Sequence, residues 1–338
     1  MKNNFQIQSP SNIALVKYWG KRSEQIPQNP SVSFTLSKSF TTMDFEIGQT
    51  NHLGIKNLTF EFEGKANEKF RIKIIDFLQS VSQDFSFFGH LNLHISSKNS
   101  FPHSAGIASS ASSMSALALG ICQIEEYFSG NKLSETDFQK KASFYARLAS
   151  GSACRSVFPK VSVWGKTPFL ADSSDEYAIA FPEIDPIFEQ FHDAILLVSK
   201  QEKAVSSRAG HSLMNNNPFA EVRYAQAKNH TEKILIALKT GNLETFIEIV
   251  EQEALTLHAL MMSSKPSFVL LQPNSLVLIE KIRDFREKTA IPVCFTIDAG
   301  PNIHLLYPKN VAEKVEIWIA EELHLFCENG QYLLDKMQ

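Results

Sequence analysis

The sequence predicts an α+β fold, in which helices alternate with strands that pair in an antiparallel manner. Segments with helical spacing of apolar residues and segments with apolar–polar alternation both recur along the chain. No G-x-G-x-x-G motif follows a predicted strand, which leaves a dinucleotide-binding fold without support. At about 150 residues per domain, the 338 residues correspond to two packed domains or to one large domain.

The first half alternates strands with helices. Strands are predicted at residues 12–19, 31–36, 58–62, 91–95 and 161–164. Helices are predicted from apolar spacing at residues 68–81 and 134–149, and from the Ala, Ser, Leu and Met content of residues 108–121. The acidic, proline-containing stretch 173–186 is the expected domain boundary.

The second half is richer in helix. Strand 194–198 precedes amphipathic helices at residues 220–239, 243–261 and 276–288, and strands 293–297 and 303–307 follow, joined by residues 298–302. The acidic stretches 248–253 and 313–322 are expected to be solvated helix faces.

The charge balance argues against a dedicated nucleic-acid binder. Lysine and arginine total 33 and aspartate and glutamate total 36, a formal charge of −3, whereas such binders usually carry a strongly basic face. Apolar residues make up 43% and charged residues 20%, so the chain can bury a sizeable core and is not expected to be disordered.

Other features of the sequence concern location. No apolar run approaches the ~18 residues that a membrane span needs, and the first ten residues lack the apolar segment of a signal peptide. The four cysteines form no C-x-x-C pair, which disfavours a zinc cluster or a dense disulfide framework. We therefore expect a cytoplasmic protein with reduced thiols and without membrane or nucleic-acid partners.

The stretch FPHSAGIASSA (residues 101–111) places a loop containing Gly106 before a helix of small residues. The free N–H groups of a helix start suit phosphate, and the hydroxyls of Ser109 and Ser110 can add donors or ligate Mg²⁺. N-capping and tight helix packing explain the same small residues at least as well. No G-K-[ST] ends the stretch, so it is not a Walker A loop.

The stretch NIALVKYWGKR (residues 12–22) carries Lys17 inside an apolar strand. A buried lysine without a counter-charge is costly, so Lys17 must reach water, a partner group or a ligand, and we favour a functional role. Arg22 is expected to be a solvated surface cation.

The stretch SGSACRS (residues 150–156) brings two hydroxyls and the Arg155 guanidinium together after a helix end. Arginine binds carboxylates bidentately, although an ordinary loop with an exposed arginine explains the stretch equally well. Cys154 is expected to be a packing residue rather than a nucleophile.

The stretch FTIDAGPN (residues 295–302) places Asp298 where an apolar strand ends and a turn begins. Aspartate commonly forms turns through its side chain, and taken alone this stretch is best explained in that way. A carboxylate at the end of a buried strand can also serve catalysis.

Taken together and in this order, the stretches resemble the diphosphomevalonate decarboxylase family of the GHMP kinase superfamily. The resemblance rests on NIALVKYWGKR, NPSVSFTL, FPHSAGIASSAS, SGSACRS with VSVWG, VSSRAGH and FTIDAGPN, which span residues 12 to 302. It implies a GHMP kinase fold with a ribosomal-protein-S5-domain-2-like part (residues 1–185), a ferredoxin-like part (residues 186–338) and the active site in the cleft between them. It also implies a homodimer.

The resemblance further implies an enzyme of isoprenoid biosynthesis that uses ATP and Mg²⁺. Such an enzyme phosphorylates the 3-hydroxyl of (R)-5-diphosphomevalonate, and loss of this phosphate and of CO₂ then gives isopentenyl diphosphate. By resemblance, Asp298 orients the 3-hydroxyl, Arg155 holds the carboxylate, and Lys17 lies beside Asp298. The other residues implied to contact substrate are Asn12, Tyr18, Lys21, Ser150 and Ser152. Those implied to bind the ATP phosphates are Gly106, Ser109, Ser110 and Ser207, with Ser110 also a ligand of Mg²⁺.

The chain departs from the usual family pattern at His103, Ser104, His211 and the pair Leu255–Thr256. These departures affect nucleotide contacts and fine substrate contacts. Three alternative functions stay open. They are decarboxylation of 5-phosphomevalonate or a 3,5-bisphosphate, a 3-kinase that stops before decarboxylation, and a catalytically inactive binding module. Retention of the charged residues makes the inactive module the weakest of the three.

Overall fold

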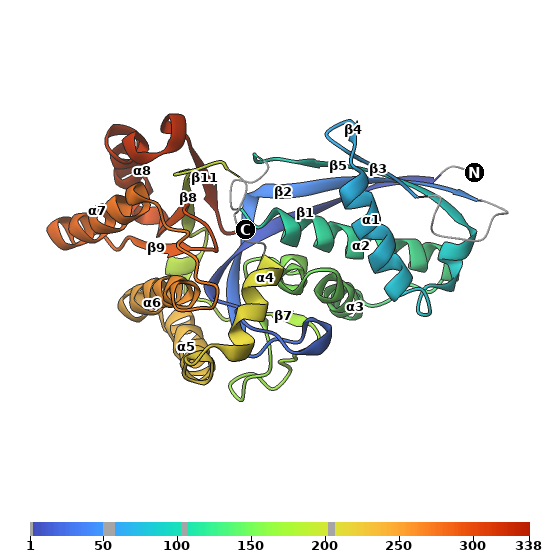
Figure 1. Ribbon diagram of the computed structural model, residues 1–338, viewed down its shortest axis with the longest axis horizontal. Coiled ribbons are helices and arrows are strands. Elements are labelled where there is room, and N and C mark those ends of the chain that lie inside the picture. Colours follow the sequence, from blue (N-terminus) through green and yellow to red (C-terminus); the bar gives the residue numbers. More distant parts are fainter. Residues whose placement is uncertain (1–2, 50–57, 103–106, 202–206) are drawn as a thin grey trace.

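The computed structural model describes residues 3–49, 58–102, 107–201 and 207–338. The structure has two sheets, one after the other along the long axis of the molecule (Figure 1). Each sheet is accompanied by helices, in agreement with the predicted α+β class. The strands of the first sheet lie between residues 3 and 180, and those of the second lie between residues 192 and 336.

The first sheet has seven strands in the order β4-β3-β5-β2-β6-β7, with β1 paired to β2. These strands are β1 (Asn3–Val16), β2 (Ser31–Gln49), β3 (Thr59–Phe62), β4 (Lys65–Ala66), β5 (Leu91–Asn99), β6 (Val161–Trp164) and β7 (Ala178–Ala180). Helices α1 (Glu68–Ser80), α2 (Ser109–Ser129) and α3 (Glu135–Ala149) lie on one side of it (Figure 1). Buried apolar side chains, among them Phe45, Ile95 and Leu117, join the sheet to the helices.

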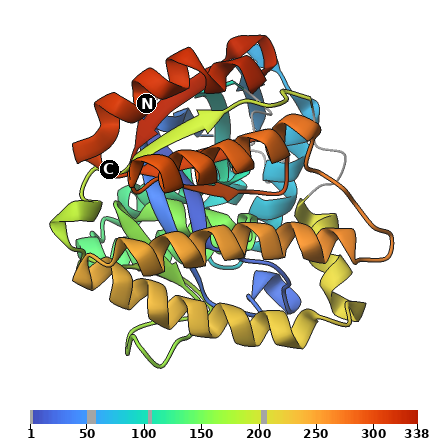
Figure 2. The same ribbon diagram turned by 90° about the vertical axis from the view of Figure 1, so that its left-hand side faces the viewer.

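The second sheet has the antiparallel order β11-β8-β10-β9. Its strands are β8 (His192–Leu196), β9 (Cys294–Ile297), β10 (Ile303–Tyr307) and β11 (Tyr332–Lys336). The helices of this half are α4 (Ser207–Ser212), α5 (Ala220–Thr240), α6 (Leu243–Met262), α7 (Pro273–Thr289) and α8 (Ala312–Glu321). The chain order strand, helices, two strands, helix, strand is the β-α-β-β-α-β order of ferredoxin-like folds. In Figure 2, α5 and α6 run side by side below α7.

A shared apolar core joins the two halves. Ile13 of β1 and Phe34 of β2 belong to the same buried cluster as Ile234 of α5 and Phe246 of α6. The rings of Phe34 and Phe246 stack with centroids 5.8 Å apart. Burial of these apolar surfaces is the main force that holds the end of β1 against α5 and α6.

The side chain of Asp335 on β11 also joins the halves. Its carboxylate accepts backbone N–H groups of β2 from Ser37 (3.1 Å), Lys38 (2.8 Å) and Ser39 (2.7 Å). Charge-assisted hydrogen bonds of this kind are stronger than those between neutral groups. The last strand of the second sheet is thereby fastened to the first sheet.

The predicted elements are present, but some bounds were wrong. β1 starts at Asn3 and ends at Val16, so Lys17 lies just beyond the strand and not inside it. β2 continues to Gln49, and the short strands β4, β7 and β11 were not predicted. β7 has only three residues, too few to show an alternation pattern. No helix among the described residues combines the length and apolar character needed to cross a bilayer.

The expectation of two solvated acidic faces was half right. Glu313, Glu321 and Glu322 at α8 are exposed, as predicted. On α6, however, Glu251 and Glu253 are 6% and 0% exposed. Each is paired with an arginine, so neither carboxylate is buried without a counter-charge.

Candidate active site

An ion pair between Lys17 and Asp298 marks the junction of the two halves. Lys17 follows β1 and Asp298 follows β9, and the Lys17 Nζ atom lies 2.9 Å from Asp298 Oδ1. The Lys17 side chain is 2% exposed, whereas that of Asp298 is 27% exposed. Burial lowers the pKa of Lys17, and the Asp298 carboxylate opposes this shift. The carboxylate is thus the more accessible member of the pair.

Arg155 is held by a group of buried polar residues. It lies in the short 3-10 helix Gly151–Val157, where its Nη1 donates to Ser31 Oγ (2.5 Å). Its Nε and Nη2 both donate to Asn12 Oδ1, at 3.4 and 3.3 Å. Asn12 Nδ2 in turn donates to Ser156 Oγ (2.7 Å) and to the Ser152 carbonyl (3.2 Å). Asn12 therefore fixes the orientation of the guanidinium.

The charges of Arg155, Lys17 and Asp298 act on one another. Burial lowers the pKa of Arg155, and the negative charge of Asp298 opposes this. The positive charge of Arg155 contributes in turn to the lowered pKa of Lys17. Two buried cations and one accessible carboxylate thus share one region, which suits a small, highly charged anionic ligand.

Tyr18 lies in an aromatic pocket next to this group. Its ring contacts Trp164 and His211, with centroids 4.6 and 4.2 Å away. The buried Tyr18 hydroxyl has no hydrogen-bond partner among the described residues. A Cβ at Gly151 would lie 3.0 Å from that hydroxyl oxygen, so glycine is what lets the two segments approach. A buried hydroxyl without a partner is unusual and fits contact with a ligand oxygen.

His211 supports the residues around Tyr18. Its Nδ1 accepts the Gly20 backbone N–H at 3.0 Å. Burial lowers the pKa of His211 to about 3, so the imidazole is neutral near pH 7. Lys21, the other residue implied to bind the diphosphate, donates to Gln25 Oε1 at 2.9 Å.

The start of α2 faces the segment that carries Arg155. No side chain among the described residues caps this helix, and Ala108 before it adopts a left-handed conformation with φ 39°. Ser110 Oγ lies 3.4 Å from Ser150 Oγ, which joins the helix start to the serines beside Arg155. Ser109 is half-buried and Ser110 is exposed. This uncapped start with accessible hydroxyls fits phosphate oxygens.

Some predicted residues are placed only in part. Gly106, His103 and Ser104 lie outside the described residues. Ser207 is the first residue of α4. No cluster of three or more His, Cys, Asp or Glu side chains able to hold a metal occurs in the part of the chain that the structure describes.

Sequence reasoning missed the buried residues behind the ion pair. Glu253 accepts the Lys17 backbone N–H, and His258 Nε2 lies 3.1 Å from the Asp298 carbonyl oxygen. A pattern in α6 could have indicated Glu253, because it lies on the helix face of Ile249, Val250 and Leu257, at spacings of four, three and four residues. The charge of this acidic stretch, taken alone, predicts exposure to solvent.

Comparisons with known proteins agree with this geometry. Residues 9–176 match the family model "Diphosphomevalonate decarboxylase-like N-terminal domain", and residues 194–336 match "Mevalonate 5-diphosphate decarboxylase C-terminal domain". A diphosphomevalonate decarboxylase of Ganoderma lucidum is 30% identical over 330 residues, covering 91% of this chain and 80% of the relative.

Solved structures are also similar over nearly the whole chain. Mevalonate diphosphate decarboxylase from Staphylococcus aureus is 27% identical with a TM-score of 0.85, covering 100% of this chain and 96% of that one. A structure of MDDEF in complex with MVAPP, AMPPCP and magnesium is 30% identical with a TM-score of 0.83, covering 99% and 97%. With both halves matched by their family models, the chain belongs to the diphosphomevalonate decarboxylase family.

Proposed function

We propose that this chain catalyses the ATP-dependent decarboxylation of (R)-5-diphosphomevalonate to isopentenyl diphosphate, with release of ADP, phosphate and CO₂. The observation that carries the proposal is the 2.9 Å pair of Lys17 and Asp298, with the Arg155 guanidinium fixed nearby. Its relative from Ganoderma lucidum is a diphosphomevalonate decarboxylase, and MDDEF binds MVAPP, AMPPCP and magnesium. These relationships support ATP and Mg²⁺ as the co-substrate and cofactor.

The reaction has two chemical steps. In the first, the 3-hydroxyl oxygen attacks the γ-phosphorus of ATP, the bond to the β-phosphate oxygen breaks, and the hydroxyl proton passes to the Asp298 carboxylate. In the second, the C3–O bond breaks as phosphate leaves, and the electrons of the bond to the carboxylate form the new double bond as CO₂ departs. Phosphorylation matters because a tertiary hydroxyl is itself a poor leaving group.

We assign the roles in these steps as follows. Asp298 accepts a hydrogen bond from the 3-hydroxyl and orients it, which matters more than basicity because phosphoryl transfer passes through a loose transition state. Lys17 holds Asp298 and faces the transferring phosphoryl group, and Arg155 binds the substrate carboxylate. Asn12 fixes Arg155, as its hydrogen bonds to the guanidinium support.

The remaining assignments concern binding. Tyr18 and Lys21 contact the diphosphate, and Ser150 and Ser152 contact other substrate oxygens. Mg²⁺ would neutralise phosphate charge, with the hydroxyl of Ser110 as the protein ligand. Residues assigned to the ATP phosphates are Gly106, Ser109, Ser110 and Ser207.

One assay separates this function from the alternatives. Purified protein is given ATP with 5-diphosphomevalonate or with 5-phosphomevalonate, and ATP consumption and CO₂ release are measured together. We expect equal amounts of ADP and CO₂ with the diphosphate. Turnover with the monophosphate alone would identify 5-phosphomevalonate as the substrate. Formation of ADP without CO₂ would indicate a 3-kinase, and no ATP consumption would indicate an inactive binding module.

We also infer the organisation and location of the protein. The division at residue 185 is supported by the two sheets, which use residues 3–180 and 192–336. A cytoplasmic location is supported by the four cysteines, all free and buried. The family resemblance supports a homodimer, which light scattering of the purified protein would test.

A further inference from the structure

The backbone of Lys17 is held by side chains, not by a neighbouring strand. β1 ends at Val16, and the next N–H, that of Lys17, donates to Glu253 Oε2 at 2.8 Å. The Lys17 carbonyl accepts from Arg223 Nη2 and from Asn29 Nδ2, both at 3.1 Å. Both backbone polar groups of this residue thus depend on long-range side-chain contacts.

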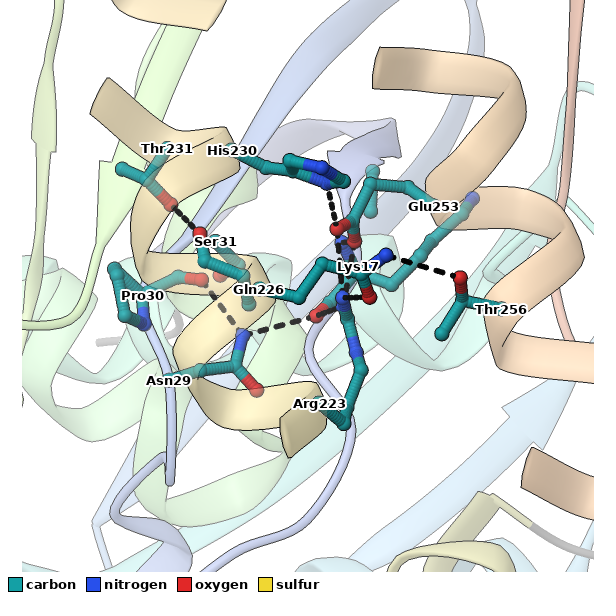
Figure 3. Close-up of polar contacts among 12 residues, drawn as sticks. Lys17, Asn29, Pro30, Ser31, Arg223, Gln226, His230, Thr231, Glu253 and Thr256 are labelled. Atoms are coloured by element: carbon teal, nitrogen blue, oxygen red, sulfur yellow. Dashed lines mark hydrogen bonds and ion pairs between the residues drawn. The ribbon is translucent and has the colours of Figure 1, made fainter. Parts of the chain in front are cut away.

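Glu253 and Arg223 form a closed, buried unit around that backbone. Arg223 donates to both carboxylate oxygens of Glu253, with Nη1–Oε1 at 2.6 Å and Nη2–Oε2 at 2.5 Å. His230 Nδ1 lies 2.7 Å from Glu253 Oε1. The exposed fractions of the Arg223 and Glu253 side chains are 1% and 0%. Figure 3 shows Arg223 and His230 of α5 in contact with Glu253 of α6, next to Lys17.

Such a unit is an expensive way to stabilise a fold. Taking two charges out of water costs several kcal/mol per ion, and well-packed apolar residues of similar volume are often equally stabilising. Here the unit lies between two helices that also contribute buried apolar residues, such as Ala227, Ile234 and Leu257. The contact that an apolar replacement could not supply is the hydrogen bond to Lys17.

The same helix also contacts the partner of Lys17. His258, five residues after Glu253 on α6, lies with Nε2 3.1 Å from the Asp298 carbonyl oxygen. Because a carbonyl can only accept, this nitrogen carries the hydrogen. α6 is therefore bonded to the backbone on both sides of the 2.9 Å ion pair.

We propose that Glu253, oriented by Arg223, is a positioning residue that sets the Lys17 ammonium against Asp298 for phosphoryl transfer. The inference rests on the proposed function but concerns residues that do not touch substrate. The rate depends strongly on the position of a catalytic group, because a displacement of about 1 Å can lower it about 100-fold. Loss of the Glu253 contact is expected to reduce kcat while leaving the binding of substrate and ATP nearly unchanged.

The test compares Glu253→Gln with Glu251→Gln. Glu251 is a matched control because it lies on the same helix, is buried, and is bound by Arg286 through Nη1 (2.6 Å) and Nη2 (3.2 Å). The described contacts of Glu251 include neither Lys17 nor Asp298. For each variant, kcat, both KM values and the melting temperature are measured with 5-diphosphomevalonate and ATP. Crystal structures of the parent and of Glu253→Gln give the distance from Lys17 Nζ to Asp298.

We expect kcat of Glu253→Gln to fall by about 10- to 100-fold with both KM values retained, and Lys17 to move away from Asp298. Glu251→Gln should lose stability but keep kcat. The proposal is overturned if both variants lose kcat equally, if only KM changes, or if Lys17 keeps its contact with Asp298. If Glu253→Gln does not fold, Arg223→Lys and its control Arg286→Lys give the same comparison.

The proposed function and the positioning role of Glu253 can be rejected independently. A parent protein that consumes no ATP and releases no CO₂ would reject the proposed function. The crystallographic comparison would still decide whether Glu253 sets the position of Lys17. A fully active parent with a fully active Glu253→Gln variant would instead reject only the positioning role.

Discussion

The Lys17 ammonium and the Asp298 carboxylate are 281 residues apart in the chain and 2.9 Å apart in the structure. Each follows the last residue of a strand, Lys17 after β1 of the first sheet and Asp298 after β9 of the second. The pair therefore exists only when both halves are folded and packed. Four predictions test how this pair and its surroundings work.

Replacing Asp298 by asparagine should lower kcat by several orders of magnitude in a protein that still folds, with a lower melting temperature because the buried Lys17 loses its counter-charge. The amide can accept a hydrogen bond but carries no charge to hold Lys17 or to favour loss of the hydroxyl proton. Steady-state kinetics and thermal unfolding check this, with Asp284→Asn as control because Asp284 is exposed and pairs only with Lys288 among the described contacts. Near-normal turnover of Asp298→Asn would reject the assignment.

Replacing Arg155 by lysine should uncouple the two steps. Lysine keeps the charge but cannot form the two parallel hydrogen bonds that hold a carboxylate. For Arg155→Lys we expect a large loss of kcat/KM and a ratio of CO₂ to ADP below that of the parent. For Arg155→Ala we expect kcat/KM to fall by several orders of magnitude. Arg22→Lys is the control, since Arg22 is exposed and pairs with Asp175. An unchanged product ratio and rate would argue against a carboxylate at Arg155.

Replacing His258 by leucine should lower kcat, because it removes the donor to the Asp298 carbonyl at nearly constant volume. Glutamine at the same position keeps a side-chain N–H and should restore much of the rate. The comparison of kcat, at equal KM and similar melting temperature, separates positioning from stability. Equal activity of the leucine and glutamine variants would show that the hydrogen bond plays no part.

The free energy of unfolding should decrease as the pH falls below 6.5. Burial lowers the pKa of His211 to about 3 and that of His258 to about 4, so both are neutral in the folded state over a range where the unfolded state takes up protons. The contribution of these two neutral imidazoles to the free energy of unfolding is fully present above pH 6.5 and is lost as the pH falls. Between about pH 5.5 and 4.5, His211→Gln should reduce the slope by about 1.4 kcal/mol per pH unit.

Urea unfolding at several pH values measures this slope. His90→Gln is the control, because His90 is exposed at the end of a short 3-10 helix. A slope in His211→Gln equal to that of the parent would mean that His211 is not held neutral in the folded protein.

The sequence allowed the fold class and the main elements to be predicted because apolar spacing is a local property. It also singled out Lys17, Arg155 and Asp298, but their convergence followed from the family resemblance and not from spacing. Distances across 281 residues depend on how the sheets pack, which no local pattern records. The end of β1 was misplaced for the same reason, because Glu253 replaces the neighbouring strand as the partner of the Lys17 N–H.

The residues behind the site were the least predictable. Charge alone assigned Glu253 to solvent, although its spacing from Ile249 and Leu257 places it on the buried face of α6. A charge on an apolar face needs a partner, and Arg223 supplies one from a different helix. A search for charged residues in register with apolar ones would have found Glu253 but not its contact with Lys17.

The carboxylate of Asp335 couples the folding of the two halves of the chain. The backbone N–H groups of Ser37, Lys38 and Ser39 donate to this side chain on the last strand of the chain. During synthesis, these three N–H groups of β2 therefore lack the Asp335 acceptor until nearly the whole chain has been translated. An excised fragment of residues 1–185 should accordingly be metastable, and the intact enzyme should melt in a single cooperative transition.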